Sequence, residues 1–310
     1  MEKTFFKSKK KKQIKPSIRR NSIGERMIKR KSALFLASSF LGVLLFFVLP
    51  FGVVGFYSVV NNPVQHKFVF LDNFISVWQN SAFQLAAGNT IKFSLVAVPL
   101  VVILSMTMAF ALEQAIPWKS RFRTLLLSPM MVPIASVVLI WQVLFHYNGV
   151  INEFIEYMDG ARIDWFKSNY AQWILVVLFV WKNLGYNMIL FMAAISNIPK
   201  EIIEVAQLES AKGWQIFFFI KLRYLSSTIL FVTILSLINS FKVFREVYML
   251  TGDYPYDSLY LLQHFMNNTF RSLDYQKLSA AAIIMCLFMI MIIGILFVTE
   301  NYFGKDMEDA

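Results

Sequence analysis

The sequence predicts an all-α membrane protein with six transmembrane helices. Its 310 residues are 57% hydrophobic and only 16% charged, whereas a soluble domain carries about 25% charged residues. Several uncharged stretches are also long enough to cross the roughly 30 Å hydrocarbon core of a bilayer as helices. These observations argue against a wholly soluble protein, and the high hydrophobicity argues against intrinsic disorder.

The individual spans follow from the positions of the charged residues. A helix needs about 20 mostly apolar residues to cross a bilayer, and five stretches meet this requirement. A sixth stretch carries Lys182 and Asn183 near its middle. We accept it because its apolar flanks offset the roughly 2.5–3.5 kcal/mol that inserting a lysine costs. The predicted spans are residues 33–60, 90–112, 124–145, 171–195, 224–241 and 278–299.

The net charge of +11 belongs to one segment of the chain. Residues 1–32 hold thirteen basic and two acidic residues, so the remaining residues are neutral overall. A basic run before an apolar segment is typical of a cytoplasmic tail held against anionic lipid, and we expect no nucleic-acid partner. The transmembrane domain then covers residues 33–300. With six spans, residues 301–310 form a second cytoplasmic tail, so both termini are expected inside.

The sequence contains no recognisable catalytic constellation. Its single cysteine, Cys286, lies in an apolar run and cannot form an intrachain disulfide. There is no phosphate-binding loop, nucleophile elbow or metal-binding histidine spacing. Lys92 and Lys182 are the ionisable residues of the predicted spans, and no acidic residue is expected beside them. This argues against a membrane-embedded enzyme or a proton-coupled secondary transporter, and we expect no catalytic residue, metal site or bound cofactor in this chain.

The most informative segment is the predicted cytoplasmic loop, residues 196–223. Pro199 suits the first turn of a helix, small and apolar residues recur along one helical face, and Gly213 would end the helix. Such a helix would be about 20 Å long, which is too short to cross a membrane. We expect it to lie along the cytoplasmic surface and to offer small residues and carboxylates to a partner. An interfacial linker helix is the alternative that the pattern leaves open.

This loop resembles the EAA loop of binding-protein-dependent ABC import permeases, E-A-A-x-x-x-G-x9-I-x-L-P. The matching positions are Glu204, Ala206, Ile220 and Leu222, and the departures are Val205, Ser210 and Arg223. The extended form of the motif in sugar permeases adds Ile198, Pro199, Glu209, Ala211, Trp214, Phe217 and Leu225. Similarity to maltose-type carbohydrate permeases extends over about residues 70–300 and includes LDNF at 71–74 and FKVFREVYMLTG at 241–252.

The resemblance implies the ABC type I importer permease fold and a role as the permease subunit of a carbohydrate importer in a bacterial cell membrane. The expected solute is an oligosaccharide, with glycerol phosphate as the alternative. The implied partners are a second homologous permease subunit in a heterodimer, two cytoplasmic ATP-binding subunits that use ATP and Mg, and an extracellular or periplasmic solute-binding protein. The residues implied to contact the ATP-binding subunit are Glu204, Val205, Ala206, Glu209, Ser210, Ala211 and Gly213.

One departure bears directly on the shape of this loop. If the family glycine adopts a positive φ, serine at position 210 costs about 1 kcal/mol, unless the turn has moved to Gly213. We expect a diverged but working contact site.

A set of polar residues lies at mid-span depth. Its members are Lys182, Asn183, Asn187, Ser236 and Asn239. They would either line a pore, where they replace the water bound to sugar hydroxyls, or join helices through hydrogen bonds worth about 0.6 kcal/mol each. Lys182 is the strongest pore candidate, because an ionisable residue inside a membrane is a functional candidate by default.

Overall fold

The computed structural model describes residues 36–62, 65, 67–113 and 118–304. The described residues are mainly helical and contain no strand, apart from an isolated antiparallel bridge between Val60 and Phe68. The chain divides into two compact units, residues 1–53 and 54–310. The basic tail and most of the C-terminal tail predicted from the sequence lie outside the described residues.

The first apolar helix runs from Leu36 to Ser58 and is long enough to cross a membrane. Within it, a π-helical stretch, η1 (Leu44–Val48), precedes α2 (Leu49–Ser58). Pro50 accounts for the π-helical winding, because proline has no N–H group and its ring clashes with the carbonyl four residues earlier. The proline therefore changes the winding of this helix locally.

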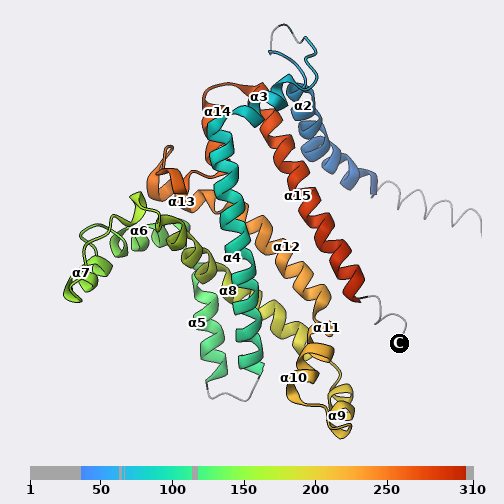
Figure 1. The fold of residues 1–310 in the computed structure, drawn as a ribbon. Helices are drawn as coiled ribbons and strands as arrows, with labels where there is room; N and C mark the ends of the chain where they lie inside the picture. Colours follow the sequence, from blue (N-terminus) through green and yellow to red (C-terminus); the bar gives the residue numbers. More distant parts are fainter. Residues whose placement is uncertain (1–35, 63–64, 66, 114–117, 305–310) are drawn as a thin grey trace, which may run out of the picture. The chain divides into compact units, whose positions relative to one another are not determined.

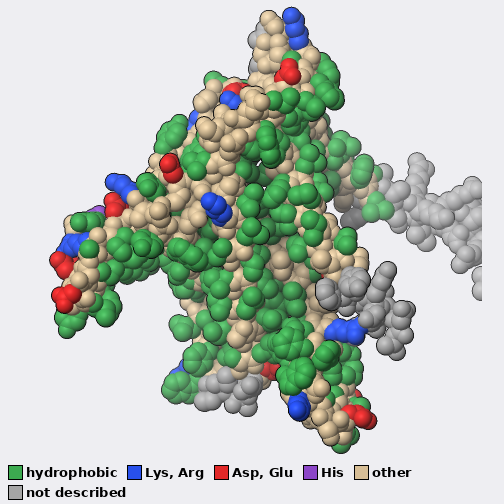
Figure 2. Space-filling view, viewed as in Figure 1, with side chains coloured by type: hydrophobic (Ala, Val, Ile, Leu, Met, Phe, Trp, Pro, Cys, Tyr) green, Lys and Arg blue, Asp and Glu red, His purple; other side chains and the backbone are tan. Residues whose placement is uncertain are grey.

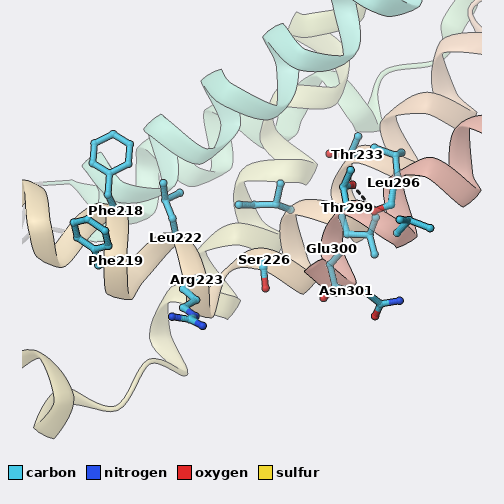
Figure 3. Close-up of a pocket in the computed structure, with 13 residues that line it drawn as sticks. Phe218, Phe219, Leu222, Arg223, Ser226, Thr233, Leu296, Thr299, Glu300 and Asn301 are labelled. Carbon is cyan, nitrogen blue, oxygen red and sulfur yellow. Dashed lines mark hydrogen bonds between the residues drawn. The ribbon is translucent and has the colours of Figure 1, made fainter. Parts of the chain in front are cut away.

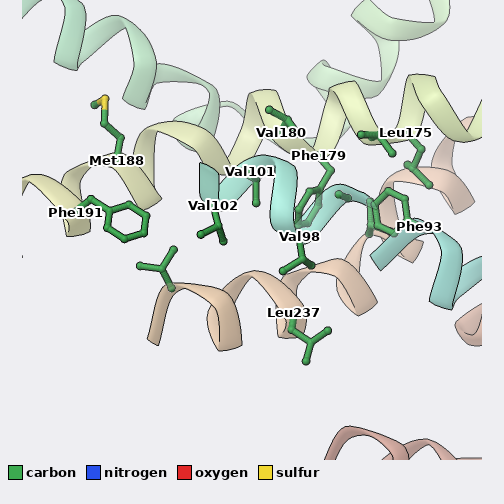
Figure 4. Close-up of a cluster of buried hydrophobic side chains, with 14 of the residues drawn as sticks. Phe93, Val98, Val101, Val102, Leu175, Phe179, Val180, Met188, Phe191 and Leu237 are labelled. Carbon is green, nitrogen blue, oxygen red and sulfur yellow. The ribbon is translucent and has the colours of Figure 1, made fainter. Parts of the chain in front are cut away.

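The second unit is built around α4 (Ser81–Glu113), α8 (Ala171–Ser196) and α12 (Ser226–Lys242). Their facing sides form a core of tightly packed aromatic and aliphatic side chains (Figure 4). At its centre, Phe93 and Phe179 meet edge to face with ring centroids 5.6 Å apart. Because all three helices contribute to one buried cluster, the core holds their relative positions.

Three helical segments are clearly longer than the predicted spans, namely the second, the fifth and the sixth. The 33 residues of α4 extend about 50 Å at 1.5 Å per residue, which exceeds the bilayer core. After α12, the short helix α13 (Phe244–Thr251) extends the fifth span. The last helix, α15 (Tyr275–Gly304), provides the sixth. Charged residues had limited the predicted spans, whereas the helices continue through them.

The segment predicted as one span over residues 124–145 is broken. It consists of α5 (Lys119–Met131) and α6 (Ile134–Leu144), which are bent by 97° with respect to each other. Val132 is extended, with ψ at 131°, because the ring of Pro133 disfavours a helical conformation in the residue before it. The described residues thus contain five continuous apolar helices, or six spans when this bent pair is counted as one.

Shorter helices lie at the two ends of the second unit. Figure 1 shows α3 (Asp72–Gln79) and α14 (Leu262–Arg271) at one end, and α9 (Lys200–Leu208) and α10 (Gly213–Gln215) at the opposite end. A separate arm carries α7 (Val150–Tyr157). The remaining short helices are η2 (Trp165–Lys167), η3 (Ile216–Lys221), α11 (Leu222–Tyr224) and η4 (Asp257–Leu259).

The α7 arm is fixed by one buried amide, Asn152. Its Nδ2 donates hydrogen bonds to the carbonyl oxygens of Tyr147 at 2.9 Å and Ile163 at 2.7 Å, and its Oδ1 accepts one from Trp165 Nε1 at 3.0 Å. A single fully buried side chain therefore holds both ends of this loop together.

The distribution of side chains fits a membrane-embedded molecule. In Figure 2, hydrophobic side chains cover most of the visible middle of the molecule, while most charged side chains lie near the ends of the helices and on the arm. Exposed apolar side chains on α4, α8 and α15, such as Leu95, Val177 and Leu287, would be unfavourable in water but suit lipid. The chain is a multi-pass membrane protein.

Candidate functional site

The helix α9 projects from the end of the second unit, with its side chains largely exposed. It begins directly after Pro199, spans nine residues and contains no buried residue. Val205 is 58% exposed and Leu208 is 86% exposed. A helix this short is only marginally stable by itself, and these exposed apolar side chains make α9 a candidate surface for a protein partner or for the membrane interface.

The turn after α9 corrects one sequence-based expectation. The helix ends at Leu208 rather than at Gly213, and Ser210 adopts a positive φ of 61°. The Ala211 N–H donates a hydrogen bond to the Ala206 carbonyl at 2.9 Å, which closes the helix as a left-handed residue at this position normally does. Gly213 instead begins α10 without a positive φ. Ser210 therefore occupies the conformation that suits glycine.

Six of the seven residues expected to contact an ATP-binding subunit lie on α9 or in the segment that joins it to α10, and the seventh, Gly213, begins α10. Five are exposed, namely Glu204, Val205, Glu209, Ser210 and Gly213. Ala206 and Ala211 are half-buried. The structure thus brings these residues together on one projecting element, with two carboxylates on its surface.

A joint links the segment after α9 to the end of α4. Lys221 Nζ lies 3.2 Å from Glu113 Oε2 and 5.4 Å from the ring centroid of Phe110. The Phe110 ring also meets Phe217 edge to face, with centroids 5.1 Å apart. Both partners on the loop side belong to the π-helix η3, a form that frequently occurs at functional positions. Movement of α9 would reach α4 through these contacts.

Three of the five predicted pathway residues line one cavity. This cavity of about 360 Å³ is bounded mainly by α8, α12 and α13, and Lys182, Asn183 and Asn239 lie in its wall. Asn239 Nδ2 donates a hydrogen bond to Asn183 Oδ1 at 3.2 Å. We name this space the amide pocket.

The other two predicted pathway residues lie elsewhere. Asn187 and Ser236 are buried, and Asn187 Nδ2 donates a hydrogen bond to Ser236 Oγ at 2.9 Å. Neither of them lines the amide pocket. Their bond joins α8 to α12, which is the helix-joining alternative that the sequence had left open.

Lys182 is paired with an acid, contrary to the expectation from the sequence. Its ammonium group forms an ion pair with Glu246 of α13, whose side chain is only 5% exposed. Glu246 lies beyond the predicted end of the fifth span at residue 241, but the helical segment continues to Thr251. Because a lone charge is costly in a membrane, each partner stabilises the other there. An acidic residue is thus present within a span.

Sequence reasoning missed several residues of the amide pocket. Lys242, Arg245 and Glu246 line it together with Tyr186 of α8. The signal that could have found them is the helical spacing of Asn239, Lys242 and Glu246, since residues three and four positions apart share a helix face.

A wide groove lies near the α9 end of the molecule. It encloses about 1150 Å³ between η3, α11, α12 and the end of α15. Figure 3 shows Phe218, Leu222 and Arg223 on one side and Leu296 and Glu300 on the other. Arg223, which departs from the family proline, therefore lines this groove. It contains none of the predicted pathway residues, and the pathway is better sought in the amide pocket.

Comparison with known proteins places the chain in a family. A family model described as the binding-protein-dependent transport system inner membrane component matches residues 101–308. The chain belongs to this family. The lactose transport system permease protein LacF of Rhizobium radiobacter is 27% identical over 237 residues, which cover 74% of this chain and 80% of LacF.

Two further comparisons agree with this result. The arabinooligosaccharides transport system permease protein AraP of Halalkalibacterium halodurans is 28% identical over 218 residues, covering 66% of this chain and 68% of AraP. In a crystal structure of a bacterial ABC transporter that imports alginate, one chain superposes with a TM-score of 0.77 at 20% identity and covers 89% of this chain and 98% of itself. The ABC importer permease fold expected from the sequence is thereby confirmed.

Proposed function

We propose that this permease is one membrane-spanning subunit of an ATP-driven importer for an oligosaccharide. The observation that carries the proposal is the unburied helix α9, whose residues resemble the EAA loop and project at one end of the molecule. The transport of lactose and arabinooligosaccharides named for two relatives favours a carbohydrate. The hydrogen-bonding amides of Asn183 and Asn239 suit a solute rich in hydroxyl groups.

The proposed mechanism needs no chemistry from this chain. A pair of cytoplasmic ATP-binding subunits would use ATP and Mg, bind α9 and displace it when they close. The joint between Glu113 and Lys221 would carry this displacement to α4, whose packing against α8 and α12 extends it to the amide pocket. A second, homologous permease subunit would complete the pore, and a solute-binding protein would deliver the sugar.

The proposal fixes an orientation in the bacterial cell membrane. Since α9 must reach ATP-binding subunits, its end of the molecule faces the cytoplasm, and the α14 end faces outward. Both termini are then cytoplasmic, in agreement with the basic residues of the N-terminal segment.

Reversing the charge of Glu204 tests the proposal. In the importer purified through a tag on this chain, we expect Glu204→Lys to lower sugar uptake at least tenfold per molecule. The reason is that charge-assisted hydrogen bonds to a partner, worth about 1.5–3 kcal/mol each, are lost and replaced by repulsion. Uptake in proteoliposomes and ATP hydrolysis are measured on the same preparation.

The matched control is Glu201→Lys, one turn earlier on the same helix and outside the seven contact residues. Its uptake should stay within about twofold of the unchanged protein. Wild-type uptake in Glu204→Lys, with normal subunit composition, would contradict the assignment of α9.

A further inference from the structure

The charges of the amide pocket exceed what a neutral sugar requires. Three basic residues, Lys182, Lys242 and Arg245, line it, and Glu246 is its acidic residue. Lys182 and Glu246 neutralise each other as an ion pair. In the described part of the chain, Lys242 and Arg245 form neither an ion pair nor a hydrogen bond with another side chain. The wall of the pocket therefore carries a net charge of two positive units.

The position of Lys242 and Arg245 along the chain limits the surroundings that their charged groups can have. Lys242 and Arg245 lie within the apolar helical segment Ser226–Thr251. Inside a membrane, a charged side chain faces protein or a water-filled cavity rather than lipid. Both residues line the amide pocket and both are exposed, so a solute in the pocket would meet their charge.

The side chains around the pocket indicate which ligand group would pair with the positive charges of Lys242 and Arg245. The ion pair with Glu246 holds Lys182 in place, so the donors free for a ligand are the ammonium of Lys242 and the guanidinium of Arg245. An arginine guanidinium matches the geometry of a carboxylate, which it can bind through two parallel hydrogen bonds. Asn183 Nδ2 donates a hydrogen bond to the Phe179 carbonyl at 2.8 Å, and Asn183 Oδ1 accepts one from Asn239. The second lone pair of Asn183 Oδ1, the Oδ1 of Asn239 and the hydroxyl of Tyr186 are left for sugar hydroxyls.

We propose that the amide pocket binds an acidic oligosaccharide, with Lys242 and Arg245 holding the carboxylate of a uronic acid unit. This inference rests on the proposed function and narrows it from carbohydrates in general to those with a negative charge. Lys242 and Arg245 are then specificity-determining residues, and Asn183 and Asn239 bind the uncharged part of the solute.

The test compares acidic sugars with neutral forms of the same sugars. Uptake is measured in cells that contain the complete importer, with labelled trigalacturonate and trimannuronate, their methyl esters, and maltotriose. The methyl esters keep the sugar ring and remove the charge. We expect uptake of an acidic trisaccharide and at least tenfold less of its ester. Lys242→Gln and Arg245→Gln should each lower uptake of the acidic sugar about tenfold, the value of one charge-assisted hydrogen bond.

Two controls separate a binding role from a structural one. Arg245→Lys keeps the charge but loses the two parallel hydrogen bonds of the guanidinium, so uptake of the acidic sugar should lie between that of Arg245→Gln and that of the unchanged protein. Lys92→Gln removes another basic residue of a membrane-spanning helix that does not line the pocket, and it should leave uptake unchanged. The amount of assembled importer is measured for every variant, so that uptake is expressed per molecule.

The outcomes distinguish this inference from the function on which it rests. Uptake of maltotriose or the esters without the acidic sugars would overturn the acidic substrate and keep the sugar importer. Uptake of none of these sugars would overturn both. If Lys92→Gln lowered uptake as much as Arg245→Gln, the effect would be one of general charge, and the assignment of Arg245 would be wrong.

Discussion

At the scale of single residues, His264 shows how burial changes the chemistry of a side chain. It is fully buried near the end of the molecule opposite α9, between the rings of Phe244 and Tyr260. Its Nδ1 accepts a hydrogen bond from the Leu261 N–H at 3.2 Å, which requires the neutral ring. Burial lowers the pKa of His264 from 6.5 to about 4, because a charged imidazolium is poorly solvated there.

This lowered pKa predicts a specific pH dependence of stability. Between pH 6.5 and about 4 the unfolded chain binds a proton at His264 that the folded chain does not, so the stability falls as the pH falls through this window. We expect His264→Phe to flatten this part of the profile of melting temperature against pH. An unchanged slope in the variant, measured in detergent from pH 7 to 4.5, would assign the acid sensitivity to other groups.

Ser210 and Lys182 show which residue-level features the sequence could predict. The motif alignment identified position 210 as the place where a positive φ would be strained, and Ser210 has that conformation. The partner of Lys182 could not be predicted, because Glu246 is 64 residues away and the pairing depends on how α8 packs against α13. A backbone conformation required at one position can be predicted from the sequence. A contact between residues on distant helices can be identified only once the fold is known.

At the scale of helices, hydrophobicity predicted where spans exist but not where helices end. Charged residues mark the limits of an apolar stretch, but α4 continues through Lys92 for eleven residues toward its N-terminus. Helical hydrogen bonding does not require apolar side chains, so the helix extends beyond the bilayer core. The break before α6 had a local signal in Pro133. The size of the bend depends on packing and could not be derived from that signal.

The joint between α4 and η3 makes a prediction at this scale. Glu113→Lys places two ammonium groups together at the end of α4, and we expect sugar uptake per ATP hydrolysed to fall severalfold, because α9 would no longer hold to α4. The pair is partly exposed, so its direct contribution to stability is about 0–1 kcal/mol. The melting temperature should therefore change little.

The exchanged pair, Glu113→Lys with Lys221→Glu, is the decisive comparison for this joint. It restores the attraction and should recover most of the coupling between ATP hydrolysis and uptake. If the double variant were as defective as Glu113→Lys alone, the ion pair would not be the element that transmits the movement.

At the scale of the whole molecule, the chain is a membrane bundle whose two ends differ in what they offer to partners. The α9 end presents exposed apolar and acidic side chains on a short helix without buried residues, whereas α14 at the opposite end packs Leu262, His264 and Phe265 into the interior. Composition predicted the membrane class, and the loop sequence predicted a short helix where α9 lies. The positive charge of the amide pocket emerged only when α12 and α13 were placed beside α8.

The orientation of these ends gives the last prediction. Replacing Cys286, which is the single cysteine of the chain, by alanine provides a background for Leu208→Cys and Tyr157→Cys, at positions that are 86% and 87% exposed. Because both positions are equally accessible within this chain, labelling by a membrane-impermeant maleimide reports the side of the membrane. Because α7 precedes the spanning helix α8 and α9 follows it, the two lie on opposite sides of the membrane. Tyr157→Cys should therefore react in intact cells, and Leu208→Cys only in opened membranes washed free of peripheral subunits. Reaction of Leu208→Cys from outside would place α9 away from ATP and overturn its proposed role, whatever sugar the importer carries.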